Sequence, residues 1–187
     1  FISSITRRDT RYMTSLSSVD SATDLADGVY KISTAAELEQ LATMTNAGLV
    51  SEGDEFVLAN NIDINGYSNW SLIGYIWERP FKGTFDGNGY VVENLNINYT
   101  REDIGYSVGL FGYANGATIK NLGVNGINIS ATGGNPSASR DKKAAGGLVG
   151  RGISITVDNC YTTSGTITNT HNTTGGLIGL IKGDNSV

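Results

Sequence analysis

Apolar positions recur with two different periods along this chain of 187 residues. In the stretch STAAELEQLATMTNAG, Leu38 and Leu41 return on one face with the spacing of a helix. Thr34 and Glu37 stand at capping-box spacing, and Gly48 provides a stop. Farther along, apolar and polar residues alternate in short runs separated by Gly- and Asn-rich turns. The pattern therefore predicts one helix followed by many short strands.

A Gly-Leu-apolar-Gly quartet returns along the strand-rich part of the chain, with Ser71 in place of the first glycine in the earliest copy. The last glycines of the four copies stand at positions 74, 112, 150 and 179, at intervals of 38, 38 and 29 residues. Intervals of this size are typical of repeat architectures. We expect the matched leucines to form the core of the repeat: Leu72, Leu110, Leu148 and Leu177.

An asparagine follows the quartets at a matching place. Asn121 and Asn159 each stand nine residues after the last glycine of a quartet. We match Asn94 to them by allowing an insertion in the first copy, which holds IWERPFKGTFDGNGY. Asparagines that stack on one another can form ladders of side-chain amides. We therefore expect Asn94, Asn121 and Asn159 to form a structural ladder at equivalent corners.

The residues beside these asparagines support stacking. Glu93, Lys120 and Asp158 precede them, so a stack would place the lysine between two carboxylates. Opposite charges on neighbouring strands stabilise a sheet by a few tenths of a kcal/mol. This favours a structural charge column over a catalytic carboxylate pair. Cys160 stands where the other copies have a core leucine, which favours packing over a nucleophilic role.

Each repeat holds two or three short strands and no helix, so it cannot bury its apolar face alone. Equivalent strands stacked about 4.8 Å apart would build one continuous core. The predicted fold is all-β: a β-solenoid, similar to a parallel β-helix, with one N-terminal capping α-helix. The alternative is a β-sandwich in which the quartets are chance turns.

The chain divides into two segments. Residues 1–28 are polar and read as a flexible N-terminal arm. Residues 29–187 hold the helix cap and the repeats, and the last repeat is incomplete. An incomplete coil leaves strand edges open to pairing. We therefore expect further repeats or another chain to complete the C-terminal coil.

The quartets resemble the GLUG motif, a repeat named for Gly-Leu-hydrophobic-Gly. The stretches STAAELEQLATMTNAG, FVLANNIDI, WSLIG and FKGTFDGNGYVVENLNI are similar to the region that commonly leads into such repeats. GLUG-motif repeats occur in large bacterial surface and secreted proteins, including adhesin-like proteins and segments of IgA-cleaving metallopeptidases. The resemblance covers about residues 30–179 and implies a surface-associated module without catalytic residues of its own.

Composition narrows the range of functions. The chain has 13 Lys and Arg against 18 Asp and Glu, a net charge of −5, which disfavours nucleic-acid binding. It has no apolar run long enough for membrane insertion. His171 is its one histidine and Cys160 its one cysteine, too few for a zinc site of the Cys/His type. We therefore predict no catalytic, cofactor-binding or metal-binding residues.

Two kinds of binding or modification site stay open. The stretch FDGNGY, residues 85–90, is better explained as a hairpin turn than as a calcium loop. Asp86 and Asn88 fit a calcium loop, but Tyr90 and Val91 stand where it needs an oxygen ligand and a glycine. Aromatic residues near the insertion either contact a glycan or fill the core: Trp70, Tyr75 and Trp77. Four sequons are candidate glycosylation sites if the source is eukaryotic or archaeal: Asn69, Asn98, Asn128 and Asn172.

These observations favour a non-enzymatic extracellular or cell-surface module that serves adhesion, presentation or spacing within a larger protein. Its partners would be host or matrix glycans or proteins. Two alternatives remain at this stage. One is the accessory region of a secreted enzyme, either a metallopeptidase or a carbohydrate-active solenoid. The other is a self-assembling, filament-like structural subunit.

Overall fold

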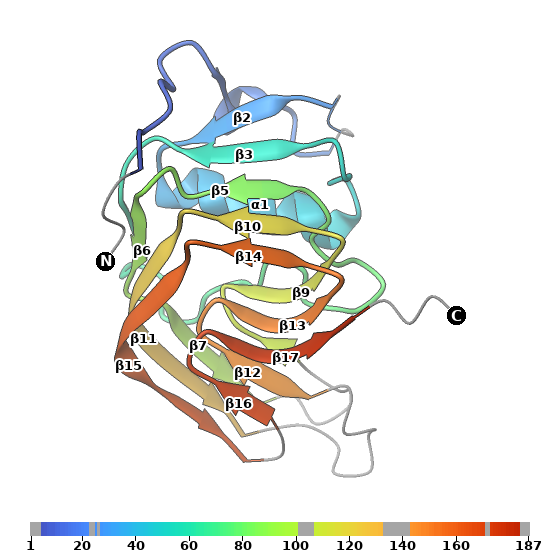
Figure 1. Cartoon of the computed structure of the whole chain (residues 1–187), viewed down its shortest axis with the longest axis vertical. Helices are drawn as coiled ribbons and strands as arrows, with labels where there is room; N and C mark the ends of the chain where they lie inside the picture. The colour runs from blue at the N-terminus through green and yellow to red at the C-terminus, as the bar shows by residue number, and fades with distance from the viewer. Residues whose placement is uncertain are drawn as a thin grey trace.

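The structure is a computed structural model that describes residues 5–22, 25, 27–100, 107–132, 143–170 and 173–183. Strands dominate these residues and one α-helix occurs among them, so the predicted all-β class is confirmed (Figure 1). The strands form four sheets, and all the strand pairs in them are parallel.

Two of the sheets are large. Sheet A contains, in spatial order, β1 (Thr14–Ser15), β2 (Val29–Ile32), β3 (Glu55–Leu58), β5 (Thr84–Asp86), β10 (Thr118–Lys120) and β14 (Thr156–Asp158). Sheet B contains β15 (Tyr161–Asn169), β11 (Gly123–Ala131), β6 (Val91–Glu93) and β4 (Ile62–Asp63), and β7 (Asn96–Tyr99) also pairs with β11.

The other two sheets have three strands each. Sheet C contains β17 (Ile178–Lys182), β13 (Val149–Ile153) and β9 (Phe111–Asn115). Sheet D contains β16 (Thr173–Gly175), β12 (Ala144–Gly146) and β8 (Ser107–Val108).

The chain passes through the four sheets in a repeating circuit. From β10 in sheet A it runs to β11 in sheet B, β12 in sheet D and β13 in sheet C, and it returns to sheet A as β14. β14 lies beside β10 with Thr118 opposite Thr156, so a circuit from 118 to 156 advances the chain by one strand. The 38-residue interval between quartets is therefore the length of one circuit, because equivalent side chains also lie 38 positions apart.

The quartets lie where the chain turns from sheet D into sheet C, and their leucines point into the core. Leu110 and Leu148 are fully buried and Leu72 is nearly so. Close contact between circuits explains the glycines. A Cβ on Gly147 would come within 2.6 Å of the Gly176 carbonyl oxygen in the next circuit. A larger residue here would push successive circuits apart.

The last circuit is less well covered than the others. Each of its strands, β14 to β17, is the outermost strand of its sheet. Leu177, predicted as a core residue, is only half-buried because nothing in the described residues stacks beyond it. Several other apolar side chains in this circuit are partly buried in the same way: Ile155, Val157, Cys160, Ile167 and Ile178.

The match of Asn94 to the other two asparagines is wrong. β6, which precedes Asn94, pairs with β11, whereas β10, which precedes Asn121, pairs with β5. Asn94 consequently lies against Gly126, with its side-chain oxygen 3.0 Å from where a Cβ would stand. Extra residues lie both between Ile73 and Phe81 and between β5 and β6, so a match by local sequence pattern with a single insertion chose the wrong strand.

Helix α1 (Ala35–Ala47) begins and ends as the sequence predicts. The Thr34 side chain accepts a hydrogen bond from the Glu37 backbone N–H, and Gly48 closes the helix with φ of 81°. α1 lies behind sheet A rather than beyond its end (Figure 1). The outermost strand at the N-terminal end is β1, followed by the short 3₁₀-helix η1 (Leu16–Ser18).

The described part of the N-terminal segment is packed, in contrast to the flexible arm that its polar composition suggests. β1 pairs with β2, and Leu16 is fully buried. Arg8 forms an ion pair with Glu55 and another with Asp86 at 3.3 Å. Few apolar residues hold this segment, so its hydrophobic pattern is too weak to predict the packing.

Candidate functional site

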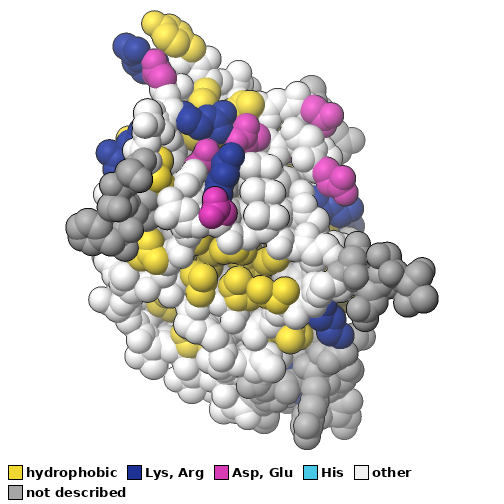
Figure 2. Space-filling model, in the orientation of Figure 1, with side chains coloured by type: hydrophobic (Ala, Val, Ile, Leu, Met, Phe, Trp, Pro, Cys, Tyr) yellow, Lys and Arg dark blue, Asp and Glu magenta, His cyan; other side chains and the backbone are white. Residues whose placement is uncertain are grey.

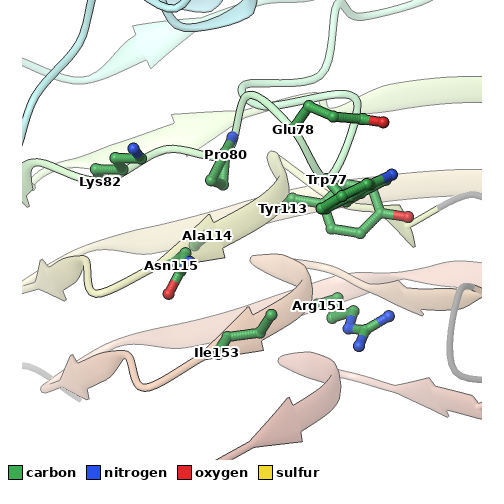
Figure 3. Close-up of a pocket in the computed structure, with 9 residues that line it drawn as sticks. All are labelled: Trp77, Glu78, Pro80, Lys82, Tyr113, Ala114, Asn115, Arg151 and Ile153. Atoms are coloured by element: carbon green, nitrogen blue, oxygen red, sulfur yellow. The ribbon is translucent and has the colours of Figure 1, made fainter. Parts of the chain in front are cut away.

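A groove with a volume of about 510 Å³ lies between sheet C and a projecting segment of the first circuit (Figure 3). Nine residues line it: Trp77, Glu78, Pro80, Lys82, Tyr113, Ala114, Asn115, Arg151 and Ile153. Grooves that combine apolar side chains with a few polar groups are the usual form of ligand sites. This groove is the candidate binding site of the protein.

The projecting segment exists because the first circuit has more residues between its quartet and sheet A than the next circuit has. Ile73 bridges to Phe111, and Phe81 bridges to Ala114. Residues 74–80 therefore span the distance that residues 112 and 113 cover in the next circuit. The additional residues leave the stack as a short arm, residues 75–80, which we call the insertion arm. Stacking of the circuits does not need this arm, so its presence calls for another explanation.

The end of α1 fixes the base of the insertion arm. The side-chain oxygen of Asn46 accepts hydrogen bonds from the backbone N–H groups of Gly74, at 3.1 Å, and Tyr75, at 2.9 Å. The Arg79 guanidinium donates to the Asn46 carbonyl oxygen at 2.8 Å. These bonds hold the arm at both ends, so the groove is formed before a ligand arrives, which lowers the entropy cost of binding.

Sheet C supplies the floor of the groove. Tyr113 of β9 lies opposite Arg151 of β13, and Asn115 lies opposite Ile153. Burial raises the pKa of the Tyr113 phenol above its usual 10.0, while the nearby charges of Arg151 and Glu78 act on it in opposite directions. The phenol is therefore protonated at neutral pH. The floor offers hydrogen-bonding groups beside apolar surface.

The arm places an exposed indole at the edge of the groove. Trp77 is 63 % exposed, and Tyr75, on the same arm but not in the groove lining, is 38 % exposed. Trp70, the third predicted aromatic contact, is only 3 % exposed and packs edge-on against Tyr67 with ring centroids 4.9 Å apart. Trp70 is therefore a core residue, and its assignment as a glycan contact is wrong.

The remaining lining residues did not stand out in the sequence. Lys82 and Arg151 bring positive charge to the groove and Glu78 brings negative charge. Figure 3 places Arg151 near Tyr113 and Lys82 at the opposite end. Lys82 and Arg151 come from different circuits, so only the register of the strands shows that they lie on one groove. The signal that could have found them is the insertion itself, read with the register of β9 and β13.

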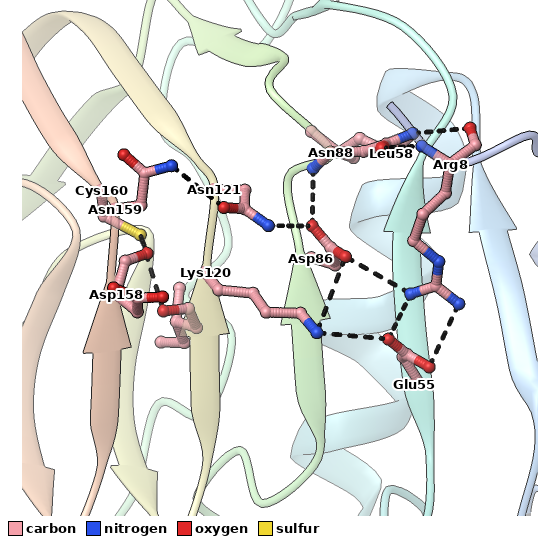
Figure 4. Close-up of polar contacts among 11 residues, drawn as sticks. Arg8, Glu55, Leu58, Asp86, Asn88, Lys120, Asn121, Asp158, Asn159 and Cys160 are labelled. Atoms are coloured by element: carbon pink, nitrogen blue, oxygen red, sulfur yellow. Dashed lines mark hydrogen bonds and ion pairs between the residues drawn. The ribbon is translucent and has the colours of Figure 1, made fainter. Parts of the chain in front are cut away.

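The predicted charge column exists on sheet A, with a different first member (Figures 2 and 4). Lys120 lies in register between Asp86 and Asp158, and its ammonium is 3.8 Å from the Asp86 carboxylate. Glu93 is instead on sheet B, opposite Asn125. The column is an ion network that links strands, because Lys120 also approaches Glu55 at 3.9 Å.

The asparagine ladder is real for two of its three predicted members. Asn159 donates to the Asn121 side-chain oxygen at 3.1 Å, and Asn121 donates to Asp86 at 3.1 Å (Figure 4). Asn94 donates to Asp63 at 2.9 Å on sheet B and so belongs to a separate corner. Each of the three asparagines has positive φ, between 51° and 64°, a conformation that asparagine tolerates well.

The stretch FDGNGY forms a turn but not the predicted hairpin, because β5 before it and β6 after it lie in different sheets. The Tyr90 N–H donates to the Gly87 carbonyl oxygen at 2.8 Å, and the central residues Asn88 and Gly89 both have positive φ, as a type I′ turn requires. Asp86 accepts a hydrogen bond from the Asn88 backbone at 2.8 Å. Within the described ranges, no group of three or more His, Cys, Asp and Glu residues is arranged to hold a metal ion.

The structure describes most of the remaining predicted positions. Cys160 is partly buried against the core, and burial raises the pKa of its thiol to about 11. The sequon residues Asn69, Asn98 and Asn128 are exposed, so glycosylation there stays a prediction. Asn172 and His171 lie outside the described residues. No helix in the described part of the chain is long and apolar enough to cross a membrane.

The chain is 30 % identical over 179 residues to Halomucin from the halophilic archaeon Haloquadratum walsbyi. The match covers 91 % of this chain and 2 % of Halomucin, so the chain spans only a small part of its relative. The expected bacterial origin finds no support in this archaeal relative. No model of a known protein family matches the chain, and no solved structure matches it.

Proposed function

We propose that the chain is a β-solenoid module of an extracellular or cell-surface protein, and that it acts by presentation, spacing or adhesion rather than catalysis. The observation that carries this proposal is the parallel circuit from β10 to β14, which returns the chain to its starting sheet one strand farther along. Repeats that contact only their neighbours can be added in series, which makes an extended and rigid spacer.

Two further observations support a surface location. Halomucin, which matches most of this chain, is a cell-surface protein. The quartets also resemble the GLUG motif of surface and secreted proteins, and we propose membership of that repeat class. The adhesive part of the function would belong to the groove, because its exposed indole serves no purpose in the stack.

The open surface of the last circuit supports a partner for the stack. Among the described residues, strands β14 to β17 each have one edge without a neighbouring strand, and half-buried apolar side chains such as Leu177 and Ile178 lie on this circuit. We propose that a further repeat covers this surface and continues the four sheets in the same register. A strand from another copy of the chain is the alternative, and it would produce a filament-like assembly.

An experiment on intact cells tests the location. Antibodies raised against the purified chain should label unbroken cells of the source organism, and external protease should remove the label. The purified chain should also show no turnover of peptides or glycans. Labelling only after lysis would contradict the surface proposal, and a robust hydrolysis that disappears in Glu93→Gln or Asp158→Asn would favour the secreted-enzyme alternative.

A further inference from the structure

We propose that the groove between the insertion arm and sheet C binds an acidic oligosaccharide, with one sugar ring stacked on Trp77 and its carboxylate directed to Arg151. The proposal gives the surface module a ligand and rests on its adhesive role. It concerns the chemistry of one groove, however, and can be tested on the purified chain whatever the location of the protein.

The exposed indole of Trp77 favours a flat ligand with an apolar face. Trp77 is 63 % exposed on an arm that Asn46 holds in place. A rigid indole beside a groove is suited to flat ligands with an apolar face. The C–H face of a pyranose ring has this shape, and the apolar side chains of Pro80, Ala114 and Ile153 extend the surface.

The polar residues that line the groove favour a ligand with hydroxyl groups. Asn115 and Glu78 supply an amide and a carboxylate that can bond to sugar hydroxyl groups, and the Tyr113 phenol adds a third polar group. A purely apolar ligand would take water away from the Asn115 amide and the Glu78 carboxylate without replacing it, which carries a free-energy penalty. An oligosaccharide satisfies both kinds of surface at once, since its rings carry hydroxyl groups at their edges.

The charged residues of the groove favour an acidic ligand. The whole chain has a net charge of −5, yet the groove contains two cations, Lys82 and Arg151, against one carboxylate, Glu78. The two cations lie toward opposite ends of the groove (Figure 3). A ligand with carboxylates on successive rings can therefore meet one cation with each. The planar guanidinium of Arg151 is suited to paired hydrogen bonds with a carboxylate.

The test uses the intrinsic fluorescence of the purified chain, because Trp70 is buried and Trp77 is exposed. We expect a tetramer of galacturonic acid to change the fluorescence in a saturable way, and added salt to weaken its binding. A neutral tetramer of glucose and a peptide of four glutamates should bind at least about tenfold more weakly. Equal binding of the neutral sugar, equal binding of the acidic peptide, or no binding of the galacturonate would each overturn the proposal.

Matched variants locate the site, with binding followed by calorimetry so that loss of an indole does not remove the signal. Trp77→Ala should weaken galacturonate binding at least about tenfold, as loss of a central aromatic contact usually does. Tyr75→Ala is the control, since Tyr75 is exposed on the same arm but outside the groove lining. Lys82→Gln should weaken binding, whereas Lys31→Gln on sheet A should not. Unchanged affinity in Trp77→Ala, or equal losses in Trp77→Ala and Tyr75→Ala, would overturn the assignment.

Discussion

Asn159 donates a hydrogen bond of 3.1 Å to the side chain of Asn121, the residue 38 positions before it. The bond joins two successive circuits at the corner between sheets A and B. Both residues also have positive φ, 51° for Asn159 and 55° for Asn121. The asparagine therefore has two roles here, as a link in the ladder and as a residue that tolerates the corner conformation.

Substitution of Asn121 separates these two roles. Asn121→Gly removes the amide but keeps the corner conformation, and we expect a loss of about 1 kcal/mol in the free energy of unfolding. Asn121→Ala also keeps a Cβ in the left-handed region without the polar side chain that lets asparagine tolerate it, which should add about 1–2 kcal/mol. Urea unfolding of both variants measures the difference. Equal losses would mean that φ does not matter at this corner.

The buried leucines of the quartets should carry much of the stability. Leu148 is fully buried, so Leu148→Ala should lower the free energy of unfolding by about 2–5 kcal/mol. Ile181→Ala is the control, because Ile181 is 55 % exposed, and it should change stability by less than about 0.5 kcal/mol. Urea denaturation gives both values, and a loss below about 1 kcal/mol for Leu148→Ala would argue against a quartet leucine inside the stack.

Glu37 should make stability depend on pH. Burial raises the pKa of this carboxyl, but hydrogen bonds from Ser15, Ser33 and Ser17 outweigh burial, so the net pKa lies below its usual 4.5. A carboxyl with a lowered folded pKa stabilises the fold fully above its unfolded pKa, and this contribution disappears as pH falls through the folded pKa.

We therefore expect Glu37→Gln to lower the free energy of unfolding by about 1–3 kcal/mol at pH 7. The difference from the unmodified protein should shrink as the pH falls below 4.5 and through the lowered folded pKa, because the glutamate then becomes protonated. Urea titrations across the acid range test this, with Glu52→Gln on an exposed turn as the control. Parallel curves for the unmodified protein and Glu37→Gln at all pH values would contradict the role given to Glu37.

Cys160 should react slowly with alkylating reagents. Burial, together with the nearby Asp158 carboxylate, raises the pKa of its thiol from 9.0 to about 11. Because only the thiolate reacts, iodoacetamide at pH 8 should modify the folded protein about a hundredfold more slowly than the urea-unfolded protein. Mass spectrometry follows the reaction. Comparable rates in the two states would show that the thiol is accessible and that its place in the core is wrong.

The periodic features of the fold could be predicted because they come from local chemistry. The capping box of Thr34 and Glu37 fixes the start of α1, and the equal spacing of Leu110 and Leu148 fixes the repeat length. The registers of β9 with β13, β10 with β14 and β11 with β15 follow from that spacing. The strands of the first circuit in sheets A and B have other offsets, and the match of Asn94 to Asn121 fails for this reason.

The candidate site was harder to predict than the fold. Trp70 and Trp77 are chemically identical and close in sequence, yet one is buried and one is exposed. Their difference depends on which part of the insertion leaves the stack, and only the bridges from Ile73 and Phe81 decide that. Arg151 comes from a different circuit and joins the groove through its register with Tyr113.

The central claim is that sheet A is a parallel stack in which Val29, Glu55, Thr84, Thr118 and Thr156 lie in one row. Electron paramagnetic resonance measures the distance between two spin labels, so labels placed on this row test its order directly. Val29→Cys and Thr156→Cys, in a chain that also carries Cys160→Ser, should give a narrow distance distribution near ~19 Å, which is four strand spacings.

Moving the first label from Val29 to Glu55 should shorten the mean distance by one strand spacing, about 5 Å. The account predicts both the narrow distribution and the stepwise shortening, because each circuit adds one strand to the row. A broad distribution, a mean distance beyond about 35 Å, or no shortening on moving the label would contradict the stacked arrangement.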